Sequence, residues 1–126
     1  MRLFIREENF TASKWFDQLK TDFKSYKTTG LLPGYFGRDA PYNHADNPQF
    51  VLDQDIRHIH LNPLRKDVRQ YDQVSNDAHL VYCQGLINED HYYLLALLEP
   101  NPHELAKRKE IMRDLAIAAH RFRLEF

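Results

Sequence analysis

The sequence predicts an α+β fold in which a small antiparallel sheet packs against an N-terminal helix and a C-terminal amphipathic helix. Two apolar runs, 78–86 and 92–98, flank the polar residues 88–90, as in a β-hairpin. Apolar residues recur at helical spacing over 15–29 and 105–126, near the two ends of the chain. With 126 residues the chain is expected to form one domain, spanning 1–126, that buries a core without disulfides or metals.

The composition is that of a folded protein, with 43% apolar and 28% charged residues. A formal net charge of −1 gives no general affinity for nucleic acid. The charges are segregated, however: residues 39–55 hold four acids and no Lys or Arg, residues 57–69 four bases and one acid, and residues 107–123 six bases and two acids. Such segregation can build a local basic surface on a neutral protein, although solvated helix faces give similar counts.

Cysteine use and the N-terminal segment indicate a cytoplasmic protein. Cys83 is the single cysteine and sits in an apolar run, which predicts a buried reduced thiol. The first ten residues are charged at 2, 6, 7 and 8 and hold too short an apolar run for a signal peptide. Nowhere do about 18 apolar residues follow one another, so we expect no contact with a membrane.

The first half of the chain reads as strand, helix and loop. Residues 1–6 alternate loosely between polar and apolar, as in a strand, and the first helix ends at Gly30, which suits a C-cap. Residues 31–48 contain three prolines and two glycines, which predicts a structured loop without a long regular element. Within it, Arg38 and Asp39 either form an internal pair that fixes the loop or present the arginine to a phosphate.

Residues 57–61, RHIHL, read as a strand with His58 and His60 on one face. These imidazoles could bind a metal, serve as acid and base near neutral pH, contact phosphate, or be ordinary surface or core histidines. A pair is weak evidence for a metal because a zinc site needs a third and usually a fourth ligand, and no further metal-ligand spacing accompanies this pair. We therefore predict no metal site.

The hairpin carries polar side chains on both faces. In strand 78–84, His79 points to one face and Tyr82 to the other, so we expect one face against helices and the other beside a ligand groove. After the hairpin, His103 stands at the entrance of the last helix. No P-loop, dinucleotide fingerprint, nucleophile elbow or internal repeat is present, so we predict no cofactor and look for function in scattered His, Arg and Tyr residues.

The last helix, 105–126, combines an apolar stripe with a basic face made by Lys109, Arg113, His120 and Arg123. Packing alone explains the stripe. The basic face could lie against RNA, bind an acidic partner, or simply keep the surface soluble.

Five segments together resemble the YafO family of bacterial type II toxins, in the same order and over most of the chain. They are FGRDAPY at 36–42, HIHL at 58–61, AHLVYCQG at 78–85, PNPHELA at 100–106 and FRLEF at 122–126. The resemblance implies a ribosome-dependent mRNA endonuclease of the bacterial cytoplasm, held inactive by a cognate YafN-type antitoxin. Its partners would be that antitoxin, the ribosome and mRNA. It also implies a RelE-like fold, which agrees with the predicted order of elements.

The mechanism that the resemblance implies is metal-independent attack of a ribose 2′-hydroxyl on the adjacent phosphate. That reaction needs a base, donors for the phosphorane charge, and an acid for the leaving oxygen. The candidates in the resembling segments are His58, His60, Arg38, Tyr82 and His103. Base and acid are not assigned among them.

Basic residues are expected to hold ribosomal and messenger phosphates. The candidates are Arg57, Arg65, Lys66, Lys109, Arg113, His120 and Arg123. A net charge of −1 departs from the strongly basic character of RelE-like toxins and implies weaker general RNA affinity, with the ribosome supplying much of the positioning. The alternative function is a non-catalytic ribosome- or RNA-binding translation inhibitor whose histidines only contact RNA.

Overall fold

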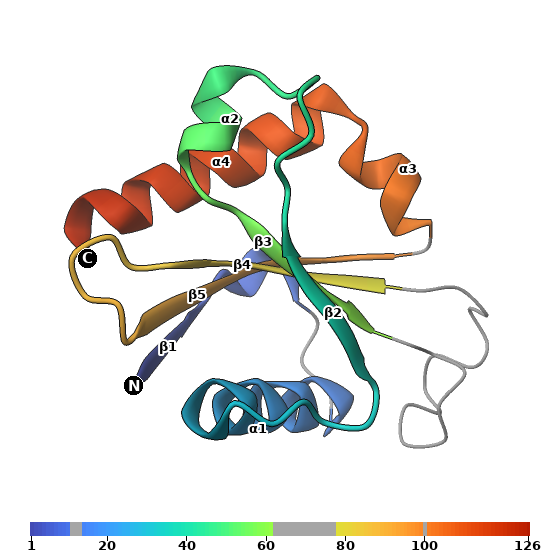
Figure 1. Cartoon of the computed structure of the whole chain (residues 1–126), viewed down its shortest axis with the longest axis vertical. Helices are drawn as coiled ribbons and strands as arrows, with labels where there is room; N and C mark the ends of the chain where they lie inside the picture. Colours follow the sequence, from blue (N-terminus) through green and yellow to red (C-terminus); the bar gives the residue numbers. More distant parts are fainter. Residues whose placement is uncertain (11–13, 62–77, 100) are drawn as a thin grey trace.

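The computed structural model describes residues 1–10, 14–61, 78–99 and 101–126. A five-stranded sheet lies between one helix on one face and the remaining α-helices on the other (Figure 1), so the α+β prediction is confirmed. The elements in chain order are β1 (Arg2–Ile5), the 3-10 helix η1 (Glu7–Asn9), α1 (Lys14–Thr29), β2 (Phe36–Pro41), α2 (Gln49–Asp53), β3 (Arg57–Leu61), β4 (Ala78–Gln84), β5 (His91–Leu98), α3 (Pro102–Ala106) and α4 (Lys109–Glu125).

The strands lie in the order β1-β5-β4-β3-β2, with the predicted hairpin of β4 and β5 near the centre. Three of the four pairings are antiparallel, but β1 runs parallel to β5, with Leu3 beside Tyr92. The sheet is therefore mixed, which departs from the antiparallel sheet that the sequence suggested. Two parallel strands need a long crossover connection, and the elements from η1 to β4 provide it between β1 and β5.

Helix α1 covers one face of the sheet. Its apolar stripe buries Phe16, Leu19 and Phe23 against Leu80 and Leu94 of the central strands. The helix ends as predicted, because Gly30 adopts a positive φ of 78° and donates its N–H to the Tyr26 carbonyl at 2.7 Å.

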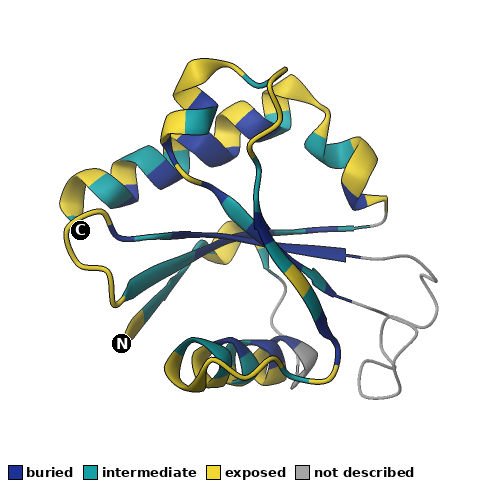
Figure 2. Ribbon diagram, viewed as in Figure 1, coloured by how far each residue is buried: buried dark blue, intermediate teal, exposed yellow. Residues whose placement is uncertain are grey.

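Helix α4 covers the other face, and its buried side turns towards the sheet (Figure 2). The predicted stripe is confirmed by Met112, Leu115, Ala119 and Phe122, which pack in one core with Cys83. Both faces thus carry helices, so the expected ligand groove does not run along an open face. Among the described residues, no helix is both long and apolar enough to cross a bilayer.

The helix predicted over 105–126 is in fact two helices, α3 and α4. Arg108 between them has extended backbone, with φ −77° and ψ 119°, and its carbonyl accepts the Met112 N–H that begins the second helix. This interruption lets α3 turn away from α4 (Figure 1), and the His103 ring of α3 lies 5.5 Å from that of His60 and 5.0 Å from that of His79.

The loop predicted over 31–48 contains the edge strand β2, so that prediction is wrong for 36–41. An edge strand tolerates proline at its end, where Pro41 stands, and glycine at a bulge, where Gly37 stands. The register against β3 shifts between Phe36 and Asp39, which leaves an extra residue on β2 opposite His60. Proline and glycine here mark an irregular strand rather than the absence of one.

Candidate active site

Three histidines from two neighbouring strands meet on the face of the sheet that α4 covers. The antiparallel register places His60 of β3 directly opposite His79 of β4, and places His58 opposite Val81. Because side chains alternate along a strand, all three imidazoles share one face. The ring centroid of His79 lies 4.3 Å from that of His60 and 4.4 Å from that of His58, and the His58 and His60 rings are 5.2 Å apart.

A fourth histidine reaches the cluster from α3. The His103 ring lies 5.0 Å from the His79 ring and 5.5 Å from the His60 ring. His103 is solvent-exposed, whereas His58 and His79 are buried. The structure therefore brings together His58, His60 and His103, which the sequence analysis selected, and adds His79. We call these four residues the histidine cluster.

Tyr42 supports the cluster from the segment that follows β2. Its ring stacks on His58 with centroids 4.0 Å apart and planes 17° apart. Its hydroxyl oxygen lies 2.6 Å from His79 Nδ1 in a hydrogen bond whose direction depends on the imidazole tautomer. This contact fixes the orientation of the His79 ring.

A cavity of about 690 Å³ opens beside the cluster. Its walls include His58, His79 and His103, and its rim carries Lys107 and Lys109. The remaining lining residues are Tyr42, His44, Asp46, Asn47 and Ala106. Three of the four histidines, His58, His79 and His103, are thus reachable from a cavity that two lysines also line, even though His58 and His79 are buried in the fold.

Burial decides the charge of the two inner histidines. His58 is 9% exposed and His79 is 1% exposed. Burial, reinforced by neighbouring histidine charges, lowers the pKa of His58 to about 4 and that of His79 to about 3. Both imidazoles are therefore neutral at physiological pH, so each offers a nitrogen lone pair. His58 Nδ1 and His79 Nε2 are buried and have no hydrogen-bond partner among the described residues.

The bulge in β2 fits closely against this cluster. A Cβ atom on Gly37 would lie 3.3 Å from the His60 carbonyl oxygen and 3.4 Å from the His60 Cβ, so glycine permits the close approach. Arg38 beside it is exposed, makes no hydrogen bond or ion pair within the described ranges, and its charge is among those that lower the pKa of His58. The guanidinium is therefore available near the cluster, and the alternative of an internal pair with Asp39 is not what the structure has.

Asp39 instead points to the opposite face, where it is 11% exposed at its side chain. Its carboxylate accepts hydrogen bonds from Tyr26 Oη at 2.7 Å and Tyr82 Oη at 2.8 Å, and it pairs with Lys27 at 3.4 Å and Arg57 at 3.3 Å. Burial by itself would raise the pKa of Asp39, but the two hydroxyls and two cations hold it below its usual value. We call this group the Asp39 network.

Two predicted site residues belong to this network and not to the histidine cluster. Tyr82 is fully buried on the α1 face, and burial raises the pKa of its hydroxyl above its usual range. Arg57 extends from β3 to the same face, in ion-pair contact with Asp39. The structure therefore does not bring Tyr82 to the histidines, and Arg57 is engaged within the fold.

The other predicted RNA contacts fall into three groups. Lys109 and Arg113 are exposed on α4, and Lys109 lies at the cavity rim. The His120 ring packs 5.5 Å from Phe50, and Arg123 Nη1 donates to the Asp53 carbonyl at 3.0 Å, so both help hold α2 against α4. Arg65 and Lys66 lie outside the described residues.

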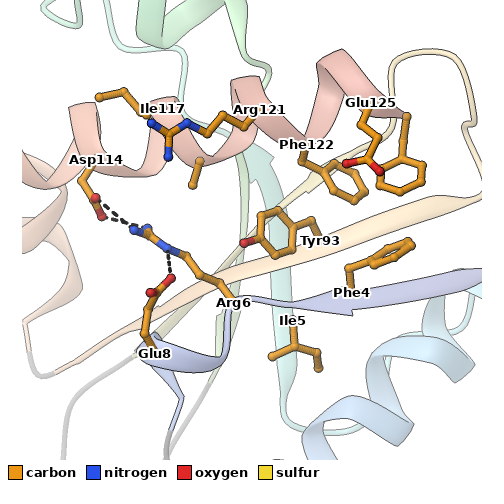
Figure 3. Close-up of a pocket in the computed structure, with 12 residues that line it drawn as sticks. Phe4, Ile5, Arg6, Glu8, Tyr93, Asp114, Ile117, Arg121, Phe122 and Glu125 are labelled. Carbon is orange, nitrogen blue, oxygen red and sulfur yellow. Dashed lines mark hydrogen bonds and ion pairs between the residues drawn. The ribbon is translucent and has the colours of Figure 1, made fainter.

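A second cavity, of about 580 Å³, lies between β1 and α4 (Figure 3). In its wall, the Arg6 guanidinium donates two hydrogen bonds to the Asp114 carboxylate, at 2.8 Å and 3.0 Å, and one to the Glu8 carboxylate at 2.9 Å. Aromatic rings, among them Tyr93 and Phe122 stacked at 4.9 Å, form another part of its wall, and Arg121 and Glu125 of α4 also line it. Arg6 already has two carboxylate partners, and no histidine is among the described residues that line this cavity, so it offers less acid–base chemistry to a reacting phosphate than the histidine cluster does.

Two comparisons with known proteins identify the family of this chain. Residues 24–124 match the family model described as toxin YafO of type II toxin–antitoxin systems. Over 114 residues, covering 87% of this chain and 86% of the relative, the chain is 40% identical to the mRNA interferase toxin YafO of Escherichia coli (strain K12). No solved structure matches, so the RelE-like comparison stays a prediction. The match spans most of both chains, and the protein therefore belongs to the YafO family of toxins from type II toxin–antitoxin systems.

Proposed function

We propose that this protein cleaves mRNA on the ribosome, without a metal, and that the histidine cluster is its catalytic site. Family membership supports a toxin with an antitoxin partner, and the name of the Escherichia coli relative supports mRNA as the substrate. The observation that carries the proposal is the convergence of His58 and His60 from β3 with His103 from α3, next to a cavity that His58 and His103 line together with Lys107 and Lys109.

The proposed reaction is an internal transesterification. The ribose 2′-oxygen loses its proton to a base and bonds to phosphorus, while the bond from phosphorus to the 5′-oxygen breaks and that oxygen takes a proton from an acid. His58 is neutral at physiological pH, so its free nitrogen can accept the first proton, and His60, whose ring lies 5.2 Å away, can serve as the acid. His103, 5.5 Å from the His60 ring, is the other candidate for the acid. Exposed Arg38 can form paired hydrogen bonds with the phosphorane oxygens.

The proposed path of the messenger runs along the rim of the cavity. Lys107 and Lys109 would hold phosphates next to the reacting one, and Arg113 continues the exposed basic surface by one helical turn. These contacts are few, and the formal net charge is −1, so general affinity for free RNA is low. The ribosome would hold the messenger in place, which compensates for the low affinity of the protein itself for RNA.

We also propose the bacterial cytoplasm as the site of action and a YafN-type protein as the cognate antitoxin. Both follow from the family, since a toxin that acts on translating ribosomes must share their compartment with its inhibitor.

Induction of the toxin in cells, followed by primer-extension mapping of messages, tests the proposal. We expect growth arrest with cut messages. In a reconstituted translation system, cutting should require ribosomes and should persist in a metal chelator. Arrested translation with intact messages would instead support the non-catalytic inhibitor, and loss of cutting in chelator would overturn the metal-independent mechanism.

A further inference from the structure

We propose that His58, His60 and His79 form a binding site for a divalent late transition-metal ion, represented by Zn²⁺, and that the bound ion inhibits RNA cleavage. The site itself rests on geometry alone. Each residue offers one ring nitrogen, and the three nitrogens all lie within 4.8 Å of one another. The inhibition rests on the proposed function, because it requires that the same imidazoles carry out the cleavage.

The spacing is close to that of a tetrahedral site. Zn–N bonds of about 2.0–2.1 Å place neighbouring ligand nitrogens roughly 3.4 Å apart. Ring rotations that move each nitrogen by about an ångström therefore close the site. Strands β3 and β4 hold the three Cα atoms in one sheet, so only side chains need to adjust.

The cluster presents the atoms that a metal of this class requires. His58 Nδ1 and His79 Nε2 are buried nitrogens without a hydrogen-bond partner among the described residues, which is unfavourable unless something binds there. The ligands are neutral imidazoles without a carboxylate in the group, a set that suits Zn²⁺, Co²⁺ or Ni²⁺ and not Mg²⁺ or Ca²⁺.

Tyr42 is placed to orient His79 as a metal ligand. When His79 Nδ1 carries the proton and donates it to Tyr42 Oη at 2.6 Å, the lone pair of Nε2 is left for the ion. The stacking of the same tyrosine ring on His58 holds the second ligand.

A fourth ligand can come from α3 or from the cavity that His58, His79 and His103 line. Exposed His103 lies 5.0 Å from the His79 ring, near enough to complete the site after a modest shift of α3, or water from the cavity can take that position. In either case the ion occupies imidazole nitrogens that the cleavage reaction needs, so the loaded protein lacks its base.

Cobalt and zinc binding to the purified, metal-stripped full chain tests the site. We expect one Co²⁺ per chain with the visible absorption of tetrahedral coordination, displaced by one equivalent of Zn²⁺. His60→Gln should weaken binding by more than about 100-fold and Tyr42→Phe by about 10-fold, whereas the matched control His91→Gln, which is outside the cluster, should bind like wild type. Circular dichroism should show that all three variants are folded.

The outcomes separate this inference from the proposed function. No stoichiometric binding, or equal binding by His60→Gln and wild type, overturns the metal site. Binding together with inhibition that chelator reverses supports both proposals. Binding that activates cleavage supports the site and overturns both the inhibition and the metal-independent mechanism. Binding without any effect on cleavage supports the site, overturns the inhibition, and shows that the cluster is not the catalytic site.

Discussion

His60 and His79 lie directly opposite each other on adjacent antiparallel strands, with their ring centroids 4.3 Å apart. One is partly exposed and the other is 1% exposed, so the same substitution has different consequences at the two positions. A substitution at His60 removes an imidazole that can transfer protons and costs little in packing, whereas a substitution at His79 also disturbs the core. His60 is therefore the better position at which to test function.

His60→Gln should lower ribosome-dependent cleavage by about 100- to 10,000-fold, because a lost acid or base has an effect of that size. The variant should stay folded and still bind the antitoxin. Single-turnover cleavage and growth after induction measure the effect. His91→Gln is the matched control, since His91 lies at the start of β5, away from the cluster, and contacts Asp90. The His91→Gln protein should remain toxic. Equal toxicity of both variants would remove His60 from the mechanism.

Asp39→Asn should lower the free energy of unfolding by roughly 3 kcal/mol, because it leaves Lys27 and Arg57 without their buried counter-charge. Urea unfolding followed by circular dichroism measures this. The control Asp46→Asn changes an exposed pair with His44 and should alter stability by less than about 0.5 kcal/mol. Similar effects for the two variants would mean that the Asp39 network does not stabilise the fold.

The Asp39 network also predicts a dependence of stability on pH. The folded-state pKa of Asp39 lies below its unfolded value, because the hydroxyl and cation contacts outweigh the opposite effect of burial. Its contribution is therefore present above the unfolded pKa of about 3.9 and is lost as the pH falls through the folded value. Wild type and Asp39→Asn should differ in stability at pH 7 and converge below about pH 4. A difference that persists unchanged at low pH would contradict this account.

Cys83→Ser should lower stability by about 1–3 kcal/mol, because a hydroxyl replaces a thiol in the core beneath α4. Cleavage by the folded fraction should be unchanged, since Cys83 is fully buried and lies outside the cluster. Burial raises the thiol pKa to about 12, so alkylating reagents should react with the native protein only slowly. A Cys83→Ser protein that is stably folded but does not cleave RNA would contradict the assignment of the reaction to the histidine cluster.

The double variant Lys109→Gln, Arg113→Gln should bind ribosomes more weakly and with a salt dependence reduced by about one to two in log–log slope. Its rate at saturating ribosome concentration should change little. Lys24→Gln is the control, since Lys24 is exposed on α1 across the sheet. Sedimentation at several salt concentrations measures the slopes. Equal slopes for the double variant and the control would show that α4 does not contact RNA.

Much of the fold follows from local patterns in the sequence. The alternation in 78–84 and the helical spacing in α1 and α4 are properties of short segments, so they can be read without knowing what each segment packs against. Strand β2 was missed because its proline and glycine are acceptable only at a sheet edge. The parallel pairing of β1 was missed because nothing local specifies the partner of a strand.

The candidate site was predictable only in part, for the same reason. His58 and His60 share a strand, so their common face follows from spacing. His79 joins them only through the register of β3 against β4, and the segment between those strands is long. Alternation along 78–84 puts His79 and Tyr82 on opposite faces, but the sequence alone does not say which of these faces carries His58 and His60. Tyr82 was predicted as a site residue because it is a proton donor in a segment that resembles the family, and His79, in the same segment, was not selected.

The parallel pairing of β1 with β5 also governs how the chain reaches its native state. Residue 2 is synthesised long before its sheet partner, residue 91, and the carboxylate that pairs with Arg6, Asp114, is synthesised later still. Closing such long loops before any contact is gained slows folding, as in other proteins of high contact order. A ribosome must therefore translate past β5 before β1 can pair with it, and past Asp114 before the Arg6 ion pair can form. Strand β1 is thus synthesised before the other four strands of the sheet but cannot join the sheet until the last of them, β5, has been made.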